Sequence, residues 1–276
     1  MTPTLELRDA VLGFGARTLW SGLTLDVQPG EFLAVLGSNG SGKTSLLKVL
    51  LGLQSLTSGS VQVTGTSPRA ARQCVGYVQQ HRRAEPHTPL RAKDVVRQGL
   101  DGHRWGFGLP GSVPWDQVGR VLVAVGAGHL ANRPIGVLSG GEQQRIRIAQ
   151  ALVTDPRLLL CDEPLLSLDL ASQRTVTALI DTRRREHDTT VVFVTHEINP
   201  VLPYVDRVLY LAGGRFRIGT PEQVMTSATL SELYGVPVDV VHSNGRILVA
   251  GIPEHGQGHH EHMHDHADDH VDGDDL

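Results

Sequence analysis

Short stretches with the two-residue period of β-strands recur along most of the chain. The continuous apolar run Phe32-Leu33-Ala34-Val35-Leu36 is typical of a strand that is covered on both faces of a sheet. The turn residues Pro29 and Gly30 precede that run. The strands that we expect are residues 5–7, 23–27, 31–36, 59–63, 74–78, 157–161, 189–194, 207–211, 238–241 and 246–250.

Apolar residues with helical spacing lie between these strands. We expect helices at residues 44–53, 142–153, 170–185 and 221–233, and further helical turns near Val95 and from Val118 to Val125. Residues 102–114 are rich in Gly and Pro and carry Trp105 and Phe107, with Trp115 directly after them. Alternating helices and buried strands predict an α/β fold with a mixed or parallel central sheet.

Composition narrows the class of protein. The two cysteines, Cys74 and Cys161, fall in apolar stretches that we interpret as strands, so we expect reduced core thiols and no disulfide. The sequence has no apolar run of 18 residues and no secretory signal, which predicts a cytoplasmic location. The basic residues are interspersed, which argues against nucleic-acid binding, and we expect Arg183 to Arg185 to form a solvated helix end.

A glycine-rich loop follows the strand at residues 31–36 and precedes a helix. Its residues fit the pattern of a P-loop: Gly37, Ser38, Asn39, Gly40, Ser41, Gly42, Lys43 and Thr44. Backbone N–H groups of such a loop and the following helix N-terminus bind phosphate. We expect Lys43 to contact the β- and γ-phosphates of a nucleotide and the Thr44 hydroxyl to bind Mg²⁺.

Two acidic residues end the strand at residues 157–161. Asp162 is placed to bind Mg²⁺, and Glu163 is placed to polarise an attacking water. Two acids at a strand end are often only a solvated turn, but a P-loop upstream favours the functional interpretation.

Together these motifs resemble the ATP-binding-cassette ATPases, from about residue 5 to residue 219. Besides the P-loop and the acidic strand end, the chain matches the signature loop of that family at Leu138, Ser139, Gly140, Gly141 and Glu142. Ser167-Leu168-Asp169 resembles the D-loop, Gln80 stands at the Q-loop position, His196 at the switch-histidine position and Phe14 where an aromatic side chain stacks on adenine. Four residues depart from the commoner pattern without removing a catalytic group: Phe14, Ser38, Gln79 and Glu142.

The resemblance implies a mechanism and partners. Two cassettes would pack head to tail, with each ATP held between the P-loop of one copy and the signature loop of the other. Glu163 would be the general base, His196 would hold the γ-phosphate and the water in line, and Gln80 would join Thr44 and Asp162 around Mg²⁺. The P-loop, Phe14, the signature loop and Asp169 would bind ATP. The ATPase would power a membrane permease from the cytoplasmic face of a bacterial membrane.

The resemblance also divides the chain. We expect a P-loop ATPase domain at residues 1–219 with an N-terminal antiparallel β subdomain and an inserted helical subdomain at about 82–155. The helical subdomain would dock on the permease, and Trp105, Phe107 and Trp115 serve either that contact or local packing. Residues 220–253 form a small α+β extension, and residues 254–276 form a tail that is disordered when unliganded.

The tail suggests the transported substrate. It carries half of the 14 histidines and 8 of the 29 acidic residues. Imidazole and carboxylate suit Zn²⁺, Ni²⁺, Cu²⁺ or Mn²⁺, in several weak sites. A solubilising tail, low-complexity drift and an engineered tag are the alternatives. The histidines are His255, His259, His260, His262, His264, His266 and His270.

Residues 230–238 resemble the C-terminal region of importer ATPases for zinc or manganese and of those for iron–siderophore complexes. The tail favours zinc or manganese, with delivery by an extracytoplasmic substrate-binding protein. A soluble cassette ATPase that acts on ribosomes or DNA is the remaining alternative. Such proteins usually carry two cassettes or a long coiled coil, and neither pattern is present.

Overall fold

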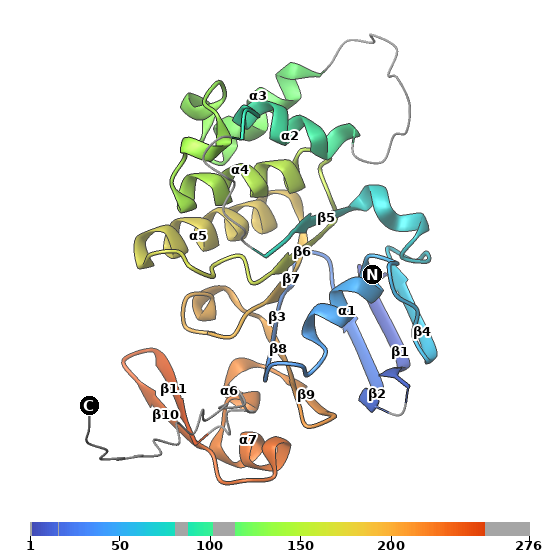
Figure 1. Ribbon diagram of the computed structural model, residues 1–276. Helices are drawn as coiled ribbons and strands as arrows, with labels where there is room; N and C mark the ends of the chain where they lie inside the picture. The colour runs from blue at the N-terminus through green and yellow to red at the C-terminus, as the bar shows by residue number, and fades with distance from the viewer. Residues whose placement is uncertain (1, 16, 81–87, 102–113, 252–276) are drawn as a thin grey trace, which may run out of the picture.

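The computed structural model describes residues 2–15, 17–80, 88–101 and 114–251. Helices pack on both sides of a central sheet, and a second, antiparallel sheet lies beside it (Figure 1). This architecture confirms the expected α/β class, with its N-terminal β subdomain and helical insertion. Trp105, Phe107 and the histidines from His255 to His270 lie outside the described residues.

The central sheet has six strands in the order β5-β6-β7-β3-β8-β9. The first five are parallel, and β9 pairs with β8 in the antiparallel sense, so the sheet is mixed as expected. Its strands are β3 (Phe32–Gly37), β5 (Val75–Val78), β6 (Leu158–Asp162), β7 (Thr190–Val194), β8 (Arg207–Ala212) and β9 (Arg215–Gly219). The sequence pattern did not predict β9, whose side chains are all exposed or half-buried.

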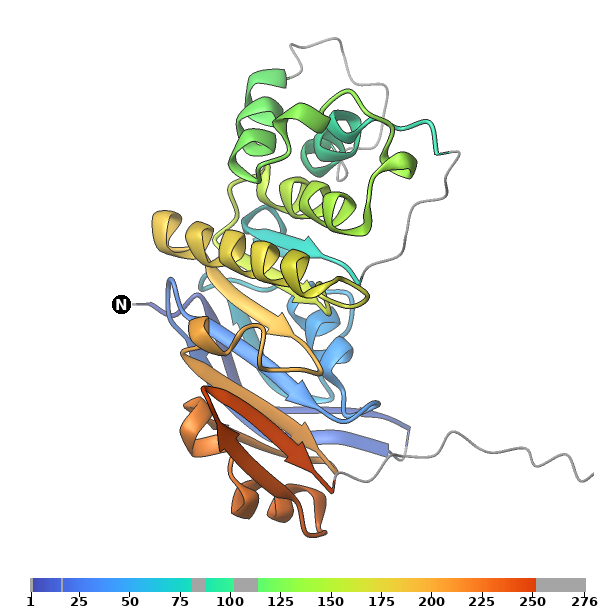
Figure 2. The same cartoon turned by 90° about the vertical axis from the view of Figure 1, so that its left-hand side faces the viewer.

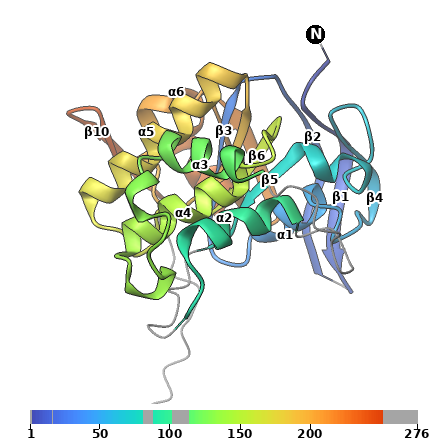
Figure 3. The same cartoon turned by 90° about the horizontal axis from the view of Figure 1, so that it is seen from above.

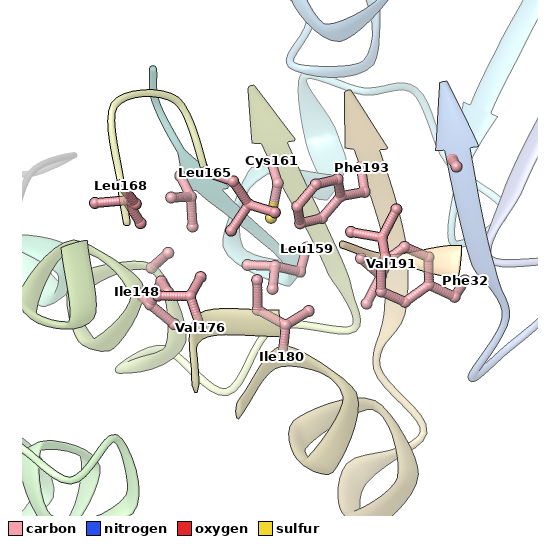
Figure 4. Packing of buried hydrophobic residues seen from close by; sticks show 14 of the residues in the cluster. Phe32, Ile148, Leu159, Cys161, Leu165, Leu168, Val176, Ile180, Val191 and Phe193 are labelled. Carbon is pink, nitrogen blue, oxygen red and sulfur yellow. The ribbon is translucent and has the colours of Figure 1, made fainter. Parts of the chain in front are cut away.

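Successive residues of the buried strand β3 lie in two different apolar clusters, one on each face of the sheet. Phe32 and Ala34 of β3 belong to one apolar cluster, and Leu33 and Val35 belong to another. Helix α1 (Lys43–Leu50) contributes to the second cluster, whereas α4 (Gly140–Leu152) and α5 (Leu170–His187) contribute to the first. Figure 4 shows Val176 and Ile180 of α5 near side chains of β6 and β7. The alternation thus places α1 and the pair α4 and α5 on opposite faces of the sheet.

The N-terminal sheet has the order β2-β1-β4 and lies on the side of α1 (Figure 3). Its strands are β1 (Leu5–Phe14), β2 (Arg17–Val27) and β4 (Ser58–Val63), all antiparallel. The indole of Trp20 is fully buried between this sheet and α1, in the same cluster as Leu46 and Leu50. This packing fixes the loop at the start of α1.

Helices α2 (Ala92–Asp101), α3 (Trp115–Ala124) and α4 form the upper part of the molecule (Figures 1 and 2). Trp115 is 41% exposed, and the cationic groups of Lys93 and Arg97 lie 5.5 and 5.6 Å from its ring centroid. Among the described residues, no helix is both long and apolar enough to cross a lipid bilayer. The boundaries of the helical subdomain, which we expect at about residues 82 and 155, stay a prediction.

The C-terminal extension differs from the single helix expected at residues 221–233. It has two short helices, α6 (Pro221–Val224) and α7 (Ser227–Tyr234), because Thr226 caps α7 through its side chain. A hairpin of β10 (Asp239–Ser243) and β11 (Arg246–Ala250) follows, as the alternation predicted. The division of the chain at residues 219 and 253 stays a prediction.

Two local expectations were wrong. Cys74 ends a short 3₁₀ helix, η1 (Ala70–Cys74), and is half-buried, whereas Cys161 lies in β6 as expected. Arg184 does not lie in solvent: its guanidinium is ion-paired with Asp181 and Asp206, and its side chain is only 15% exposed. A run of arginines does not reveal Asp206, which lies 22 residues further along the chain.

Candidate active site

The loops that follow four neighbouring parallel strands meet at the carboxyl edge of the central sheet. The P-loop follows β3, Gln80 follows β5, Glu163 follows β6 and His196 follows β7. Ligands of open α/β sheets bind at this edge. The sheet therefore brings together most of the catalytic residues predicted from the sequence.

The P-loop backbone depends on its glycines. Gly37 has φ +141°, and a Cβ atom there would overlap the carbonyl oxygen of Leu211 in β8. Gly42 has φ +100°, and a Cβ atom there would lie 2.9 Å from Nε1 of Trp20. Neither position accepts a side chain without displacing its neighbour. The strand, the indole and the loop therefore form one rigid cradle.

Lys43 crosses this cradle from the first turn of α1. Its Nζ donates hydrogen bonds to the carbonyl oxygens of Gly37 at 2.7 Å and Ser38 at 2.9 Å. The side chain is buried, which lowers the pKa of Lys43, while the charges of Glu163 and Asp162 oppose that effect. An ammonium group held against the backbone of a loop whose N–H groups can bind phosphate suits a polyphosphate.

A Gly37→Ala variant is expected to lose about 3 kcal/mol or more of unfolding free energy, because Cβ would strike backbone that cannot move away. Gly40→Ala is the matched control, since Gly40 also has positive φ but its nearest neighbour is the flexible side chain of Arg17. We expect this control to lose about 1 kcal/mol. Urea unfolding of both variants measures the difference, and equal losses would contradict the rigid cradle.

Two of the side chains expected to bind Mg²⁺, Thr44 and Asp162, lie next to each other. Oδ1 of Asp162 lies 3.5 Å from the Thr44 hydroxyl, and Oδ2 accepts a hydrogen bond from the Tyr77 hydroxyl at 3.4 Å. Burial, followed by the charge of Glu163, raises the pKa of Asp162. Burial also raises the pKa of Tyr77 to about 12, so this phenol donates at neutral pH. The hard oxygen donors fit Mg²⁺.

Glu163 lies at the centre of the remaining polar contacts. Its Oε2 accepts a hydrogen bond from Nε2 of Gln80 at 3.1 Å, and its Oε1 contacts Nε2 of His196. The backbone of Glu163 has φ +47°, a conformation that is uncommon outside glycine. A carboxylate between a histidine and an amide can accept a proton from water.

The signature loop begins α4 two residues earlier than expected. Ser139 is the N-cap: its hydroxyl accepts from the backbone N–H of Glu142, and the Glu142 carboxylate accepts from the N–H of Ser139 at 2.7 Å. That backbone hydrogen bond holds the pKa of Glu142 below its usual range. Glu142 is therefore ionised at neutral pH and orders the loop.

Asp169 lies beside the signature loop. It caps α5 by accepting hydrogen bonds from the backbone N–H and the hydroxyl of Ser172, and these hold the pKa of Asp169 below its usual range. A Cβ atom at Gly141 would lie 2.5 Å from Oγ of Ser172. The second glycine of the signature loop thus allows α4 and α5 to begin side by side.

The structure does not bring every expected nucleotide-binding residue to one place. The P-loop begins α1 on one face of the sheet, and the signature loop begins α4 on the other face. Phe14 is 56% exposed at the end of β1, on the side of the P-loop. The guanidinium of Arg17, which sequence reasoning missed, donates to the carbonyl oxygen of Gly40 at 3.2 Å. Nothing in the sequence pattern distinguishes Arg17 from other surface arginines.

The chain was compared with known families and proteins. The family model described as ABC transporter matches residues 20–166. The chain is 32% identical over 234 residues to the zinc import ATP-binding protein ZnuC of Halorhodospira halophila, covering 84% of each protein. It is 37% identical over 247 residues to the aliphatic sulfonates import ATP-binding protein SsuB 1 of Pseudomonas fluorescens, covering 85% of this chain and 88% of that protein.

A solved structure has a similar fold. It is an ABC transporter, assigned to the metal-chelate type, in an inward-facing conformation. The TM-score is 0.76 at 30% sequence identity, over 90% of this chain and 96% of that chain. The similarity therefore extends beyond the segment that the family model matches.

Proposed function

The chain belongs to the ABC transporter family, and we propose that it is the ATP-hydrolysing subunit of an importer for a divalent transition metal, zinc or manganese. As a member of that family it is an ATPase that binds ATP and Mg²⁺. It works as a dimer of cassettes together with membrane permease components. We place it at the cytoplasmic face of the membrane, with a substrate-binding protein on the other side.

We propose the following roles for the site residues. Lys43 and the P-loop N–H groups hold the β- and γ-phosphates, and Thr44, Asp162 and Gln80 supply the Mg²⁺ ligands. Bound Mg²⁺ neutralises charge on these phosphates. Glu163 takes the proton from the attacking water, and His196 orients that water against the γ-phosphate. The observation that carries this assignment is the contact of one carboxylate, Glu163, with both Gln80 and His196.

We further propose that the active site is completed by a second copy. The signature loop and Asp169 begin helices on the face of the sheet opposite α1, so they are poorly placed to reach the phosphates of their own chain. A head-to-tail pair of cassettes would supply these helix N-termini to the nucleotide of the partner. Phosphate charge would close the dimer, and hydrolysis would open it.

The choice of metal as substrate rests on the tail. Seven histidines between His255 and His270 are interleaved with acidic residues, a composition that suits transition-metal ions. The similarity to a zinc import protein and to a metal-chelate type transporter supports this choice. The similarity to an aliphatic sulfonate import protein supports a second candidate substrate, an organosulfonate. An iron–siderophore complex is a third.

A chromosomal Glu163→Gln replacement is expected to separate these candidates. If the chain powers zinc or manganese import, cells with this replacement accumulate several-fold less of that metal at low supply. They grow normally with an alkanesulfonate as the sulfur source or with a ferric siderophore as the iron source. Elemental analysis and growth curves measure both. Normal metal content with lost growth on the sulfonate or the siderophore would overturn the metal assignment.

The same experiment includes a strain that lacks residues 254–276. If the tail senses or buffers the imported ion, this strain imports metal, but its uptake responds differently from wild type to rising free Zn²⁺ or Mn²⁺. An identical response with and without the tail would refute that role. The metal assignment would then be tested by the Glu163→Gln strain alone.

A further inference from the structure

The loop that carries His196 is short and held at both ends. We call residues 195–202, which follow β7, the His196 loop. Thr195 is buried; its N–H donates to the carbonyl of Val35 in β3, and its hydroxyl is hydrogen-bonded to both the N–H and the carbonyl of Glu197. Ile198 is 4% exposed and belongs to the apolar core. His196 itself is exposed, so the loop backbone sets where its imidazole lies.

Asn199 joins this loop to the C-terminal hairpin. Its Nδ2 donates to the carbonyl oxygen of Ile247 at 2.9 Å, and its Oδ1 accepts from the N–H of Ile247 at 2.8 Å. One side-chain amide thus pairs with both backbone groups of a residue in β11, in the manner of a neighbouring strand. Ile247 is 5% exposed and lies in the same apolar cluster as Ile198. In Figure 2 the orange segment after β7 lies beside the red hairpin.

The hairpin has separate attachments on its other side. The N–H of Val240 donates to Oγ of Ser227 at 2.9 Å, and the imidazole of His242 contacts the carbonyl of Met225 at 2.9 Å. A cavity of about 340 Å³ lies between the hairpin, α6 and the 3₁₀ turn η4 (Leu202–Tyr204). The cavity separates part of the hairpin from the end of the His196 loop. The hydrogen bonds between Asn199 and Ile247 are therefore a localised contact between the two segments.

We infer that Asn199 is a positioning residue that couples the C-terminal hairpin to His196, so that the contact between Asn199 and Ile247 influences the rate of ATP hydrolysis. This inference rests on the proposed role of His196. The amide contacts hold Asn199 in place, directly after the buried Ile198. Pro200 restricts the backbone of Asn199 further. Only Glu197 and Ile198 lie between Asn199 and His196, so the amide is one of the contacts that hold the loop backbone near the imidazole, and losing it loosens that backbone. The hairpin thereby acts on hydrolysis only indirectly, through the position of His196.

The test compares Asn199→Ala with Ser227→Ala in the full-length chain. Both variants remove a hairpin attachment, but only the first faces the His196 loop. We expect Asn199→Ala to lower kcat about threefold to tenfold with an unchanged KM for ATP, and to speed backbone hydrogen exchange at residues 196–202. Ser227→Ala is expected to keep the wild-type kcat and the wild-type exchange in that loop.

A second variant, Asn199→Asp, separates the proposed coupling from a general loss of folding. Asn199→Asp has the same size and keeps the acceptor for the N–H of Ile247, but it places a carboxylate against the carbonyl of Ile247. We expect it also to lower kcat and to speed exchange in the His196 loop. Wild-type kcat and exchange in both Asn199 variants would overturn the coupling. A His196→Ala chain with the wild-type rate would instead overturn the proposed role of His196.

Discussion

Replacing Glu163 with Gln is expected to lower the rate of ATP hydrolysis by about a hundredfold or more while ATP still binds. The amide keeps the size of the side chain but cannot take a proton from water. The P-loop, Lys43 and Thr44 are untouched, so the phosphates are still held. ATP should then persist in the site, and the variant should accumulate as a dimer that size-exclusion chromatography with light scattering detects.

The matched control for this prediction is Glu197→Gln. Glu197 is an exposed loop carboxylate next to His196, and its side chain has no proposed role in hydrolysis. The control should hydrolyse ATP at the wild-type rate and should not accumulate as a dimer. Wild-type turnover by Glu163→Gln would show that another group removes the proton.

Replacing Lys43 with Ala is expected to weaken ATP binding by about a hundredfold. The ammonium group is buried against the carbonyls of Gly37 and Ser38 and has no substitute nearby in the P-loop, whose other side chains are uncharged. Calorimetric titration with ATP and Mg²⁺ measures the loss. Lys48→Ala removes an exposed lysine one turn further along α1 and should bind ATP like wild type. Equal affinities of the two variants would contradict the role of Lys43.

The parts of the site that depend on contiguous residues could be predicted from the sequence alone. The glycine spacing of the P-loop and the apolar run before Asp162 are local patterns, and each directly implies a strand that ends at a loop. The order of the motifs then identified the family. The capping box of Ser139 and Glu142 is equally local, because its two residues lie within one helical turn.

Other features depend on residues that only the fold brings together. The Tyr77 hydroxyl meets Asp162 because β5 and β6 are neighbours, and Asn199 meets Ile247 across 48 residues of sequence. Strand β9 has no fully buried side chains, so its sequence lacks the apolar pattern that predicts a strand. Such contacts follow from strand order and packing rather than from local periodicity, so the sequence pattern contains no signal for them.

In the proposed dimer, each active site combines the P-loop of one copy with the signature loop of the other. Lys43→Ala removes phosphate binding from a P-loop, and Ser139→Phe blocks a signature loop whose serine is exposed. Each variant alone should be inactive. An equimolar mixture forms mixed dimers with one intact composite site, so we expect recovery of roughly a quarter of wild-type ATPase activity. A mixture no more active than the two variants measured separately would show that the two loops do not share a site.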